Sequence, residues 1–186
     1  MPAPRFGEVL VEVKATAICG TDLHIYAGQT PVVYPRIPGH EFAGVVEQVG
    51  EGVTEFSPGD SVVLNPNFSC NNCELCILGK ENLCLDSRLM GRETDGSLRE
   101  YLTVPQTLVF KMPSHVSFAE GARVQPLSTV VHGQRLADIK PGESVVVLGQ
   151  GATGLMHTRL SKLAGAYPII AVELAPWKLD LALEMG

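Results

Sequence analysis

The chain has 186 residues, enough for one domain or for two small ones. Hydrophobic residues make up 45% and charged residues 18%, which is typical of a globular protein, and no stretch approaches the roughly 18 consecutive apolar residues of a membrane span. The net charge of -6 gives no sign of the clustered Lys and Arg that nucleic acid requires, so we expect no nucleic acid as a partner. Without an apolar span, we expect no membrane as a partner either. No signal peptide is evident, and we expect a cytoplasmic protein.

Short apolar runs punctuated by Gly and Pro predict an all-β region up to about Met112. These runs include residues 9–11, 44–46 and 61–64. The pattern changes at Ser117, where a helix is predicted to start, and a second helix is predicted to follow Pro126 and to end near Asp138.

The rest of the chain alternates between strands and helices. We predict strands at 144–148 and 168–172, and helices at 152–164 and 176–185. This order is the opening of a doubly wound parallel sheet. We therefore divide the chain into an all-β-rich domain, 1–127, and the first part of an α/β domain, 128–186.

Four of the five cysteines lie in one short polar segment, at Cys70, Cys73, Cys76 and Cys84. Four thiolates suit a closed tetrahedral zinc site of the structural kind. Ordinary free cysteines are the alternative, although four thiols so close together would be a redox liability unless a metal bound them.

A second set of metal-binding side chains comes earlier, with Cys19 in one motif and His40 and Glu41 in another. A catalytic zinc needs three protein ligands and one open position, where it can lower the pKa of a bound alcohol. We predict Cys19 and His40 as ligands. Asp22 is predicted to accept a hydrogen bond from the other imidazole nitrogen of His40, and helix capping is the alternative for this residue.

A G-x-G-x-x-G run follows the predicted strand 144–148 and opens the next helix. In this context the run predicts a dinucleotide-binding loop, because glycines allow the backbone to approach a pyrophosphate at a helix N-terminus. The predicted cofactor-binding residues of the loop are Gly149, Gly151, Ala152, Thr153 and Gly154.

Glu173 ends the following predicted strand, nineteen residues after Gly154. A carboxylate there can bind the ribose hydroxyls and would repel a 2'-phosphate, so NAD is preferred over NADP.

Together these motifs resemble the medium-chain zinc-dependent alcohol dehydrogenase family, in its polyol and threonine dehydrogenase-like branch. The resemblance covers nearly the whole chain. It implies a GroES-like, all-β-rich catalytic domain with a four-cysteine zinc lobe, followed by the first half of an α/β Rossmann domain. Relative to the family the chain looks truncated at both ends, which puts its activity as a lone chain in question.

The resemblance also implies roles for several side chains. Thr21 would take the proton of a zinc-bound alcohol and His24 would pass it to solvent, although both could be turn residues. Lys178 occupies a position where the family often has a base near the ribose, and an exposed helix lysine is an equally good account.

One position departs from the family pattern. The branch usually has Glu just before the proline of the segment 121–127, and this chain has Gln125. An amide oxygen is a weak zinc ligand, so we hypothesise that Cys19, His40 and Glu41 hold the metal with Gln125 beside it.

These observations favour an oxidoreductase with two zinc ions per chain, one catalytic and one structural, that oxidises a secondary alcohol or polyol, or reduces the ketone, with NAD(H). The alternatives are a catalytically inactive zinc-binding remnant and a non-enzymatic zinc-stabilised interaction module. The substrate would be a small molecule, and a homo-oligomer is left open for a full-length form.

Overall fold

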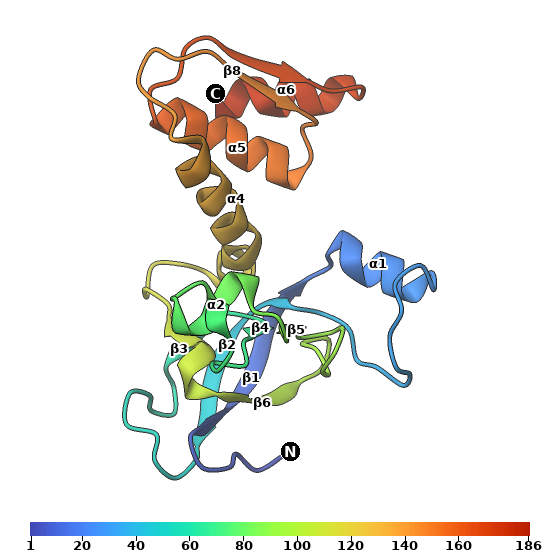
Figure 1. Ribbon diagram of the computed structural model, residues 1–186, viewed down its shortest axis with the longest axis vertical. Helices are drawn as coiled ribbons and strands as arrows, with labels where there is room; N and C mark the ends of the chain where they lie inside the picture. Colours follow the sequence, from blue (N-terminus) through green and yellow to red (C-terminus); the bar gives the residue numbers. More distant parts are fainter. The chain divides into compact units, whose positions relative to one another are not determined.

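The computed structural model describes residues 1 to 186 (Figure 1). Internal contacts divide the chain into two compact units, Met1–Gln125 and Pro126–Gly186. The first unit contains, in chain order, β1 (Glu8–Ala17), α1 (Gly20–Tyr26), β2 (Glu41–Val49), β3 (Ser61–Leu64), β4 (Asn67–Phe68), α2 (Glu74–Ile77), the 3-10 helix η1 (Glu81–Leu83), β5 (Arg88–Leu89), β6 (Tyr101–Pro105), the 3-10 helix η2 (Gln106–Leu108), β7 (Val109–Lys111) and α3 (Phe118–Gly121). The following elements are α4 (Val124–Ala137), which begins in the first unit, then β8 (Val145–Leu148), α5 (Ala152–Leu163), β9 (Ile169–Val172) and α6 (Pro176–Met185).

Five antiparallel strands form the main sheet of the first unit, in the order β6-β1-β2-β3-β7. β1 pairs on both sides, so that Val9 lies opposite Val49 of β2 and Val104 of β6. Two register shifts between β1 and β2 increase the local twist and help the sheet to curl. The core contains Val9, Val11, Phe42, Val46, Phe56, Val62, Leu64, Met90, Leu102, Val104 and Val109.

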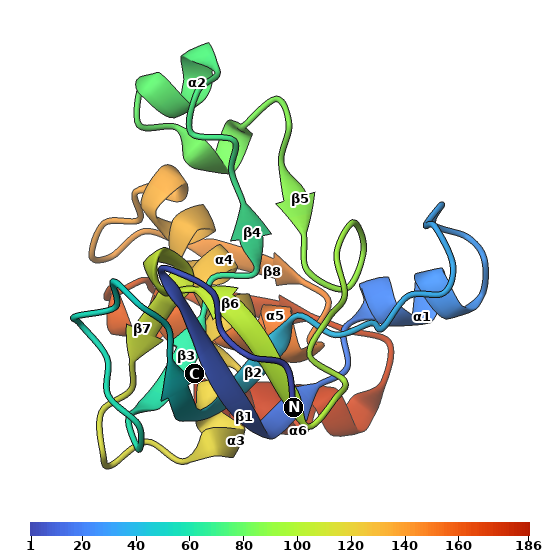
Figure 2. The same cartoon turned by 90° about the horizontal axis from the view of Figure 1, so that it is seen from below.

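The strands predicted at residues 9–11, 44–46 and 61–64 lie within β1, β2 and β3, which confirms the all-β character of this region. The short strands β4 and β5 pair with each other, and α2 and η1 lie between them in the chain. Together they form a lobe that projects away from the main sheet (Figure 2). This lobe carries the four clustered cysteines.

The helix α3, near the end of the first unit, starts at a recognisable cap. The Ser117 hydroxyl accepts the Glu120 N–H at 3.3 Å, while the Glu120 carboxylate accepts the Ser117 N–H at 2.8 Å, so α3 begins with a capping box. The next helix, α4, begins at Val124 and not after Pro126 as predicted. Proline is tolerated in the first turn because its missing N–H would have no partner within the helix there.

The second unit is a strand-helix-strand-helix arrangement, as predicted. β8 and β9 are parallel, with Val145 opposite Ile169, and α5 and α6 pack against them. The strands remain open to solvent at several apolar side chains: Val146 is 57% exposed, Leu148 78%, Ile170 49% and Val172 47%. Parallel sheets usually have both faces covered, so this pair of strands has one apolar face without a cover.

None of the helices is both long and apolar enough to cross a membrane.

Candidate active site

The four lobe cysteines form one cluster, in which every sulfur lies within 4.8 Å of the others. Cys76 Sγ is 3.9 Å from Cys70 Sγ and 3.5 Å from Cys73 Sγ. In a tetrahedron of four thiolates at about 2.3 Å from zinc, neighbouring sulfurs are about 3.8 Å apart. The sulfur positions therefore fit a structural zinc ion.

Backbone N–H groups of the lobe lower the pKa of two of these thiols. The Leu85 N–H is the main cause that lowers the pKa of Cys73 to about 6, and the Cys70 N–H, 3.2 Å from Cys84 Sγ, lowers the pKa of Cys84. Burial instead raises the pKa of Cys76 to about 12. Thiolates are the ligating form, so the buried Cys76 thiol depends most on a bound cation for its ionisation.

The second cluster brings together Cys19, His40 and Glu41, whose ligand atoms all lie within 4.8 Å of one another. Cys19 follows β1 and caps α1, whereas His40 directly precedes β2 and Glu41 begins it. His40 is 4% exposed and Glu41 is 8% exposed. Ligands at about 2.0 to 2.3 Å from zinc lie about 3.3 to 3.8 Å apart, so a small contraction would complete the site. A buried carboxylate beside a thiol and an imidazole fits a divalent cation.

Asp22 lies beside this cluster and is 5% exposed. Its Oδ1 is 3.7 Å from His40 Nδ1, too far for the hydrogen bond that the sequence predicts. The two carboxylate oxygens instead accept backbone N–H groups, from Cys19 at 2.8 Å and from Gly39 at 2.9 Å. The Cys19 contact is the helix cap that was the alternative prediction. Through both contacts, Asp22 connects the two segments that carry the candidate ligands.

Thr21 and His24 lie on α1. The Thr21 hydroxyl is 3.7 Å from the Cys19 sulfur, at the edge of the ligand cluster. His24 is exposed, and its Nδ1 lies 2.6 Å from Gln29 Oε1. The structure thus places one residue of the predicted proton relay at the cluster and the other at the surface of the same helix.

The turn that carries His40 is held by the segment 96–98, which the sequence analysis did not single out. The Gly96 N–H donates to Ile37 O at 2.7 Å, and the Ser97 N–H donates to Gly39 O at 2.9 Å. Ser97 is fully buried, with its hydroxyl 3.0 Å from that of Thr16. These contacts fix the backbone directly before His40.

Close backbone packing makes glycine necessary at this turn. A Cβ on Gly96 would lie 2.2 Å from Gly39 O and 2.3 Å from Pro38 O. A Cβ on Gly91 would lie 2.8 Å from the Gly39 nitrogen, and Gly91 also has a φ of +82°. The Asp95-Gly96 pair is a turn signal in the sequence, but nothing local indicates that it contacts the His40 turn.

Gln125 is the last residue of the first unit and is half-buried in the first turn of α4. The candidate ligand atoms of Cys19, His40 and Glu41 already lie within 4.8 Å of one another. The relation of Gln125 to the metal therefore stays a hypothesis.

The predicted cofactor loop connects β8 to α5. The Gly149 N–H continues the parallel ladder by donating to Val172 O at 2.7 Å, and Gly149 has a φ of +87°. A Cβ on Gly154 would lie 1.9 Å from Gly149 O, so the helix can approach the strand only with glycine at this position. Gly151 is the N-cap of α5, whose first turn contains Ala152 and Thr153. The loop has the strand-turn-helix geometry that an anion-binding helix N-terminus requires.

Glu173 lies beside this loop at the end of β9. Its carboxylate accepts N–H groups from Gln150 at 2.8 Å, Leu174 at 2.7 Å and Ala175 at 3.2 Å. These bonds, led by the one from Gln150, lower the pKa of Glu173 and keep it ionised. Lys178 Nζ is 3.8 Å from Glu173 Oε2, so part of this charge has a counter-ion.

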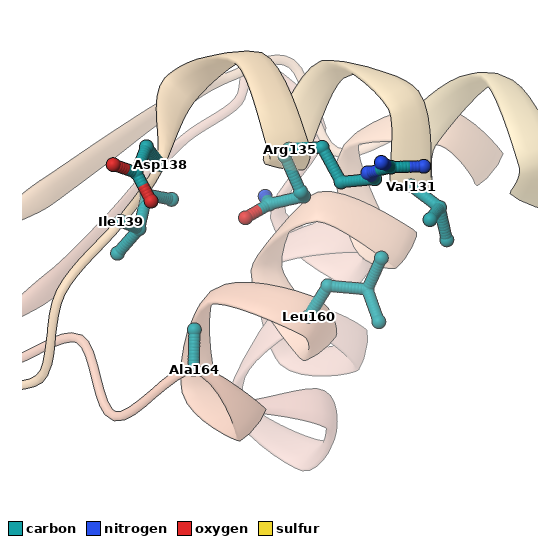
Figure 3. A pocket seen from close by; sticks show the side chains of 7 residues that line it. Val131, Arg135, Asp138, Ile139, Leu160 and Ala164 are labelled. Atoms are coloured by element: carbon teal, nitrogen blue, oxygen red, sulfur yellow. The ribbon is translucent and has the colours of Figure 1, made fainter.

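A separate pocket of about 450 Å³ lies between α4 and α5 of the second unit (Figure 3). Val131, Leu160 and Ala164 line it together with Arg135 and Asp138. It contains none of the predicted metal or cofactor residues. The pocket is therefore not part of the candidate site.

Comparison with known proteins agrees with this combination of a fold and two groups of candidate metal ligands. Residues 5–114 match the alcohol dehydrogenase GroES-like domain. The chain is 41% identical over 180 residues to D-xylulose reductase A of Aspergillus niger, covering 94% of this chain and 50% of that protein. It is 37% identical over 193 residues to sorbitol dehydrogenase of Bacillus subtilis, covering 100% of this chain and 55% of that protein.

A solved structure gives a similar result. A protein described as a zinc-binding dehydrogenase from Sinorhizobium meliloti 1021, bound to NADP, superimposes with a TM-score of 0.96 at 39% identity, covering 100% of this chain and 54% of that one. The chain thus spans about half the length of the relatives it matches.

The first unit thus has the GroES-like domain of the alcohol dehydrogenases and carries two cysteine-containing clusters. The chain belongs to the medium-chain zinc-dependent alcohol dehydrogenase family, and the names of its relatives fit the polyol branch. The family resemblance and the fold class predicted from the sequence are both confirmed.

Proposed function

We propose that the chain acts as a zinc-dependent oxidoreductase that oxidises a secondary alcohol or polyol, or reduces the ketone, with NAD(H). The observation that carries this proposal is the convergence of Cys19, His40 and Glu41 on one point, with ligand atoms within 4.8 Å of one another. In this proposal, residues 1–127 supply the metal and proton chemistry and residues 128–186 supply the cofactor loop.

When bound, zinc would acidify the substrate hydroxyl and NAD would accept the hydride. The chain's own side chains would orient the reaction and move the proton. Thr21 would receive the hydroxyl proton, and the distance of 3.7 Å between its oxygen and a candidate ligand sulfur supports this role. His24, exposed on the same helix, would release the proton to solvent. Asp22 holds the backbone of both ligand segments, so it acts as a positioning residue.

The direct test combines zinc analysis with an assay for NADH formation on a panel of secondary alcohols and sugar alcohols. We expect two zinc ions per chain and NADH formation with at least one substrate. Zinc binding without any binding of NAD would instead support an inactive remnant. A folded zinc protein that binds neither NAD nor alcohol, and that associates with another protein, would support the interaction module.

The third ligand of the catalytic zinc can be identified by metal content. We expect Glu41→Ala to lose one zinc ion per chain, because the Glu41 carboxylate belongs to the observed cluster. Gln125→Ala should retain both ions, since a neutral amide is a weak ligand. Loss of the ion in Gln125→Ala alone would contradict the assignment to Glu41.

Glu173 is the basis for our proposal that NAD is preferred over NADP. An ionised carboxylate at the ribose binds the 2'-hydroxyl and repels a 2'-phosphate, although one structural relative was solved with NADP. We expect Glu173→Ala to reduce the ratio of NAD to NADP affinity by about ten-fold or more, corresponding to about 1.4 kcal/mol.

A substitution of Lys178 should change the same affinity ratio in the opposite direction. Because Lys178 lies 3.8 Å from the Glu173 carboxylate, Lys178→Met should leave the negative charge less compensated and strengthen the rejection of NADP. Equal ratios in the wild type and in both variants would contradict a role of Glu173 in cofactor selection.

A further inference from the structure

Gln150 occupies the second position of the glycine loop, between Gly149 and Gly151. The sequence motif allows any residue there, yet Gln150 is only 1% exposed. An uncharged amide so deeply buried needs hydrogen-bond partners, because an unsatisfied buried polar group is costly. The partners of Gln150 show what its side chain does.

The Gln150 amide connects β8 to α5 beneath the loop. Its Nε2 donates to Val147 O at 3.2 Å, and its Oε1 accepts the Thr158 hydroxyl at 2.9 Å. Thr158 lies in the second half of α5 and is 2% exposed. A Cβ on Gly154 would lie 3.8 Å from Gln150 Nε2, so the amide also lies against the first turn of α5.

The main chain of Gln150 has a different anchor. Its N–H donates to Glu173 Oε2 at 2.8 Å, which connects the loop to the residue that directly follows β9. One residue therefore attaches the loop at two places, with the side chain bound to α5 and the main chain bound to Glu173. Both attachments are made within the second unit.

We propose that Gln150 is a positioning residue that presets the loop 149–154 for the pyrophosphate of the dinucleotide, an inference that rests on the proposed function. Two attachments on one residue leave the loop little freedom, and a preset loop binds an anion without an additional ordering cost. The effect should fall on ligands that carry a pyrophosphate. Adenosine, which lacks phosphate, should depend much less on the Gln150 side chain.

The experiment measures the affinities of ADP and adenosine for the full chain by calorimetry. Gln150→Met keeps the volume but removes both hydrogen bonds, and we expect ADP binding to weaken by about ten-fold, as loss of one or two hydrogen bonds predicts. Adenosine binding should change by less than about two-fold. Thr158→Val removes only the hydroxyl partner, so it should weaken ADP binding by about three-fold. This second variant tests the proposal even if Gln150→Met does not fold.

Gln134→Met is the matched control, because Gln134 is another glutamine of the second unit whose amide binds α5, at Ser161 Oγ with a distance of 3.2 Å. It should leave the ratio of ADP to adenosine affinity at the wild-type value. The positioning role is overturned if Gln150→Met or Thr158→Val weakens ADP and adenosine binding by the same factor. It is also overturned if these variants change neither affinity. In both cases the proposed function stands. A wild-type chain that binds neither ADP nor NAD overturns the proposed function and this inference together.

Discussion

A Cys76→Ser variant is expected to contain one zinc ion fewer per chain than the wild type and to lose the ordered structure of the four-cysteine lobe. Cys76 is one of the two buried members of the cluster, and its sulfur lies within 4 Å of two others. The lobe has little apolar core of its own, because Ile77, Leu78 and Leu85 are all more than 65% exposed. Metal binding must therefore supply most of the stability of the lobe.

Apparent binding energies of structural zinc sites are about 10 to 16 kcal/mol, so loss of the ion should leave the lobe without most of its stability. Zinc analysis and limited proteolysis between residues 70 and 86 would measure the two effects. Cys19→Ser is the matched control, since it should also lose one zinc ion but leave the lobe resistant to protease. A protease-resistant lobe in Cys76→Ser would contradict the structural role of this metal.

The second large effect is expected for Gly96→Ala, which should lose the zinc ion that we propose Cys19, His40 and Glu41 bind. The new methyl group would lie 2.2 Å from Gly39 O and 2.3 Å from Pro38 O, so the backbone before His40 has to move. Such overpacking against backbone atoms costs about 3 kcal/mol or more. The displacement would also disturb the Asp22 contact to the Gly39 N–H.

Zinc content and the midpoint of thermal unfolding would test this prediction. We expect one remaining zinc ion, in the lobe, and a lower midpoint. Gly20→Ala is the control, because Gly20 is next to Cys19 but a Cβ there meets no atom within 4 Å. Two zinc ions in Gly96→Ala, with an unchanged midpoint, would show that the turn accommodates the methyl group.

Features that depend on residues close in sequence could be predicted. The four cysteines lie within 15 positions, and the glycine loop joins a strand to the helix that follows directly, so local spacing determined their geometry. Cys19 and His40 are farther apart, and their proximity was expected from the family resemblance. The structure does place them in one cluster.

Features that depend on long-range backbone contacts could not be predicted. Asp22 was expected to accept a hydrogen bond from the His40 ring, but its oxygens accept the N–H groups of Cys19 and Gly39, and Oδ1 lies 3.7 Å from His40 Nδ1. The contact of Gly96 with the His40 turn joins segments nearly 60 residues apart, and no periodicity or motif in the sequence predicts it. The burial of Gln150 was likewise hidden, because the glycine motif constrains only its neighbours.

The uncovered apolar face of β8 and β9 has a consequence for the solution behaviour of the chain. Val146, Leu148, Ile170 and Val172 present branched aliphatic side chains to water on two adjacent strands. Salts that are excluded from protein surfaces, such as sulfate, favour the burial of such groups. Sulfate should therefore favour self-association of this chain through this face, and the choice of buffer salt will influence how the chain behaves during purification and crystallisation.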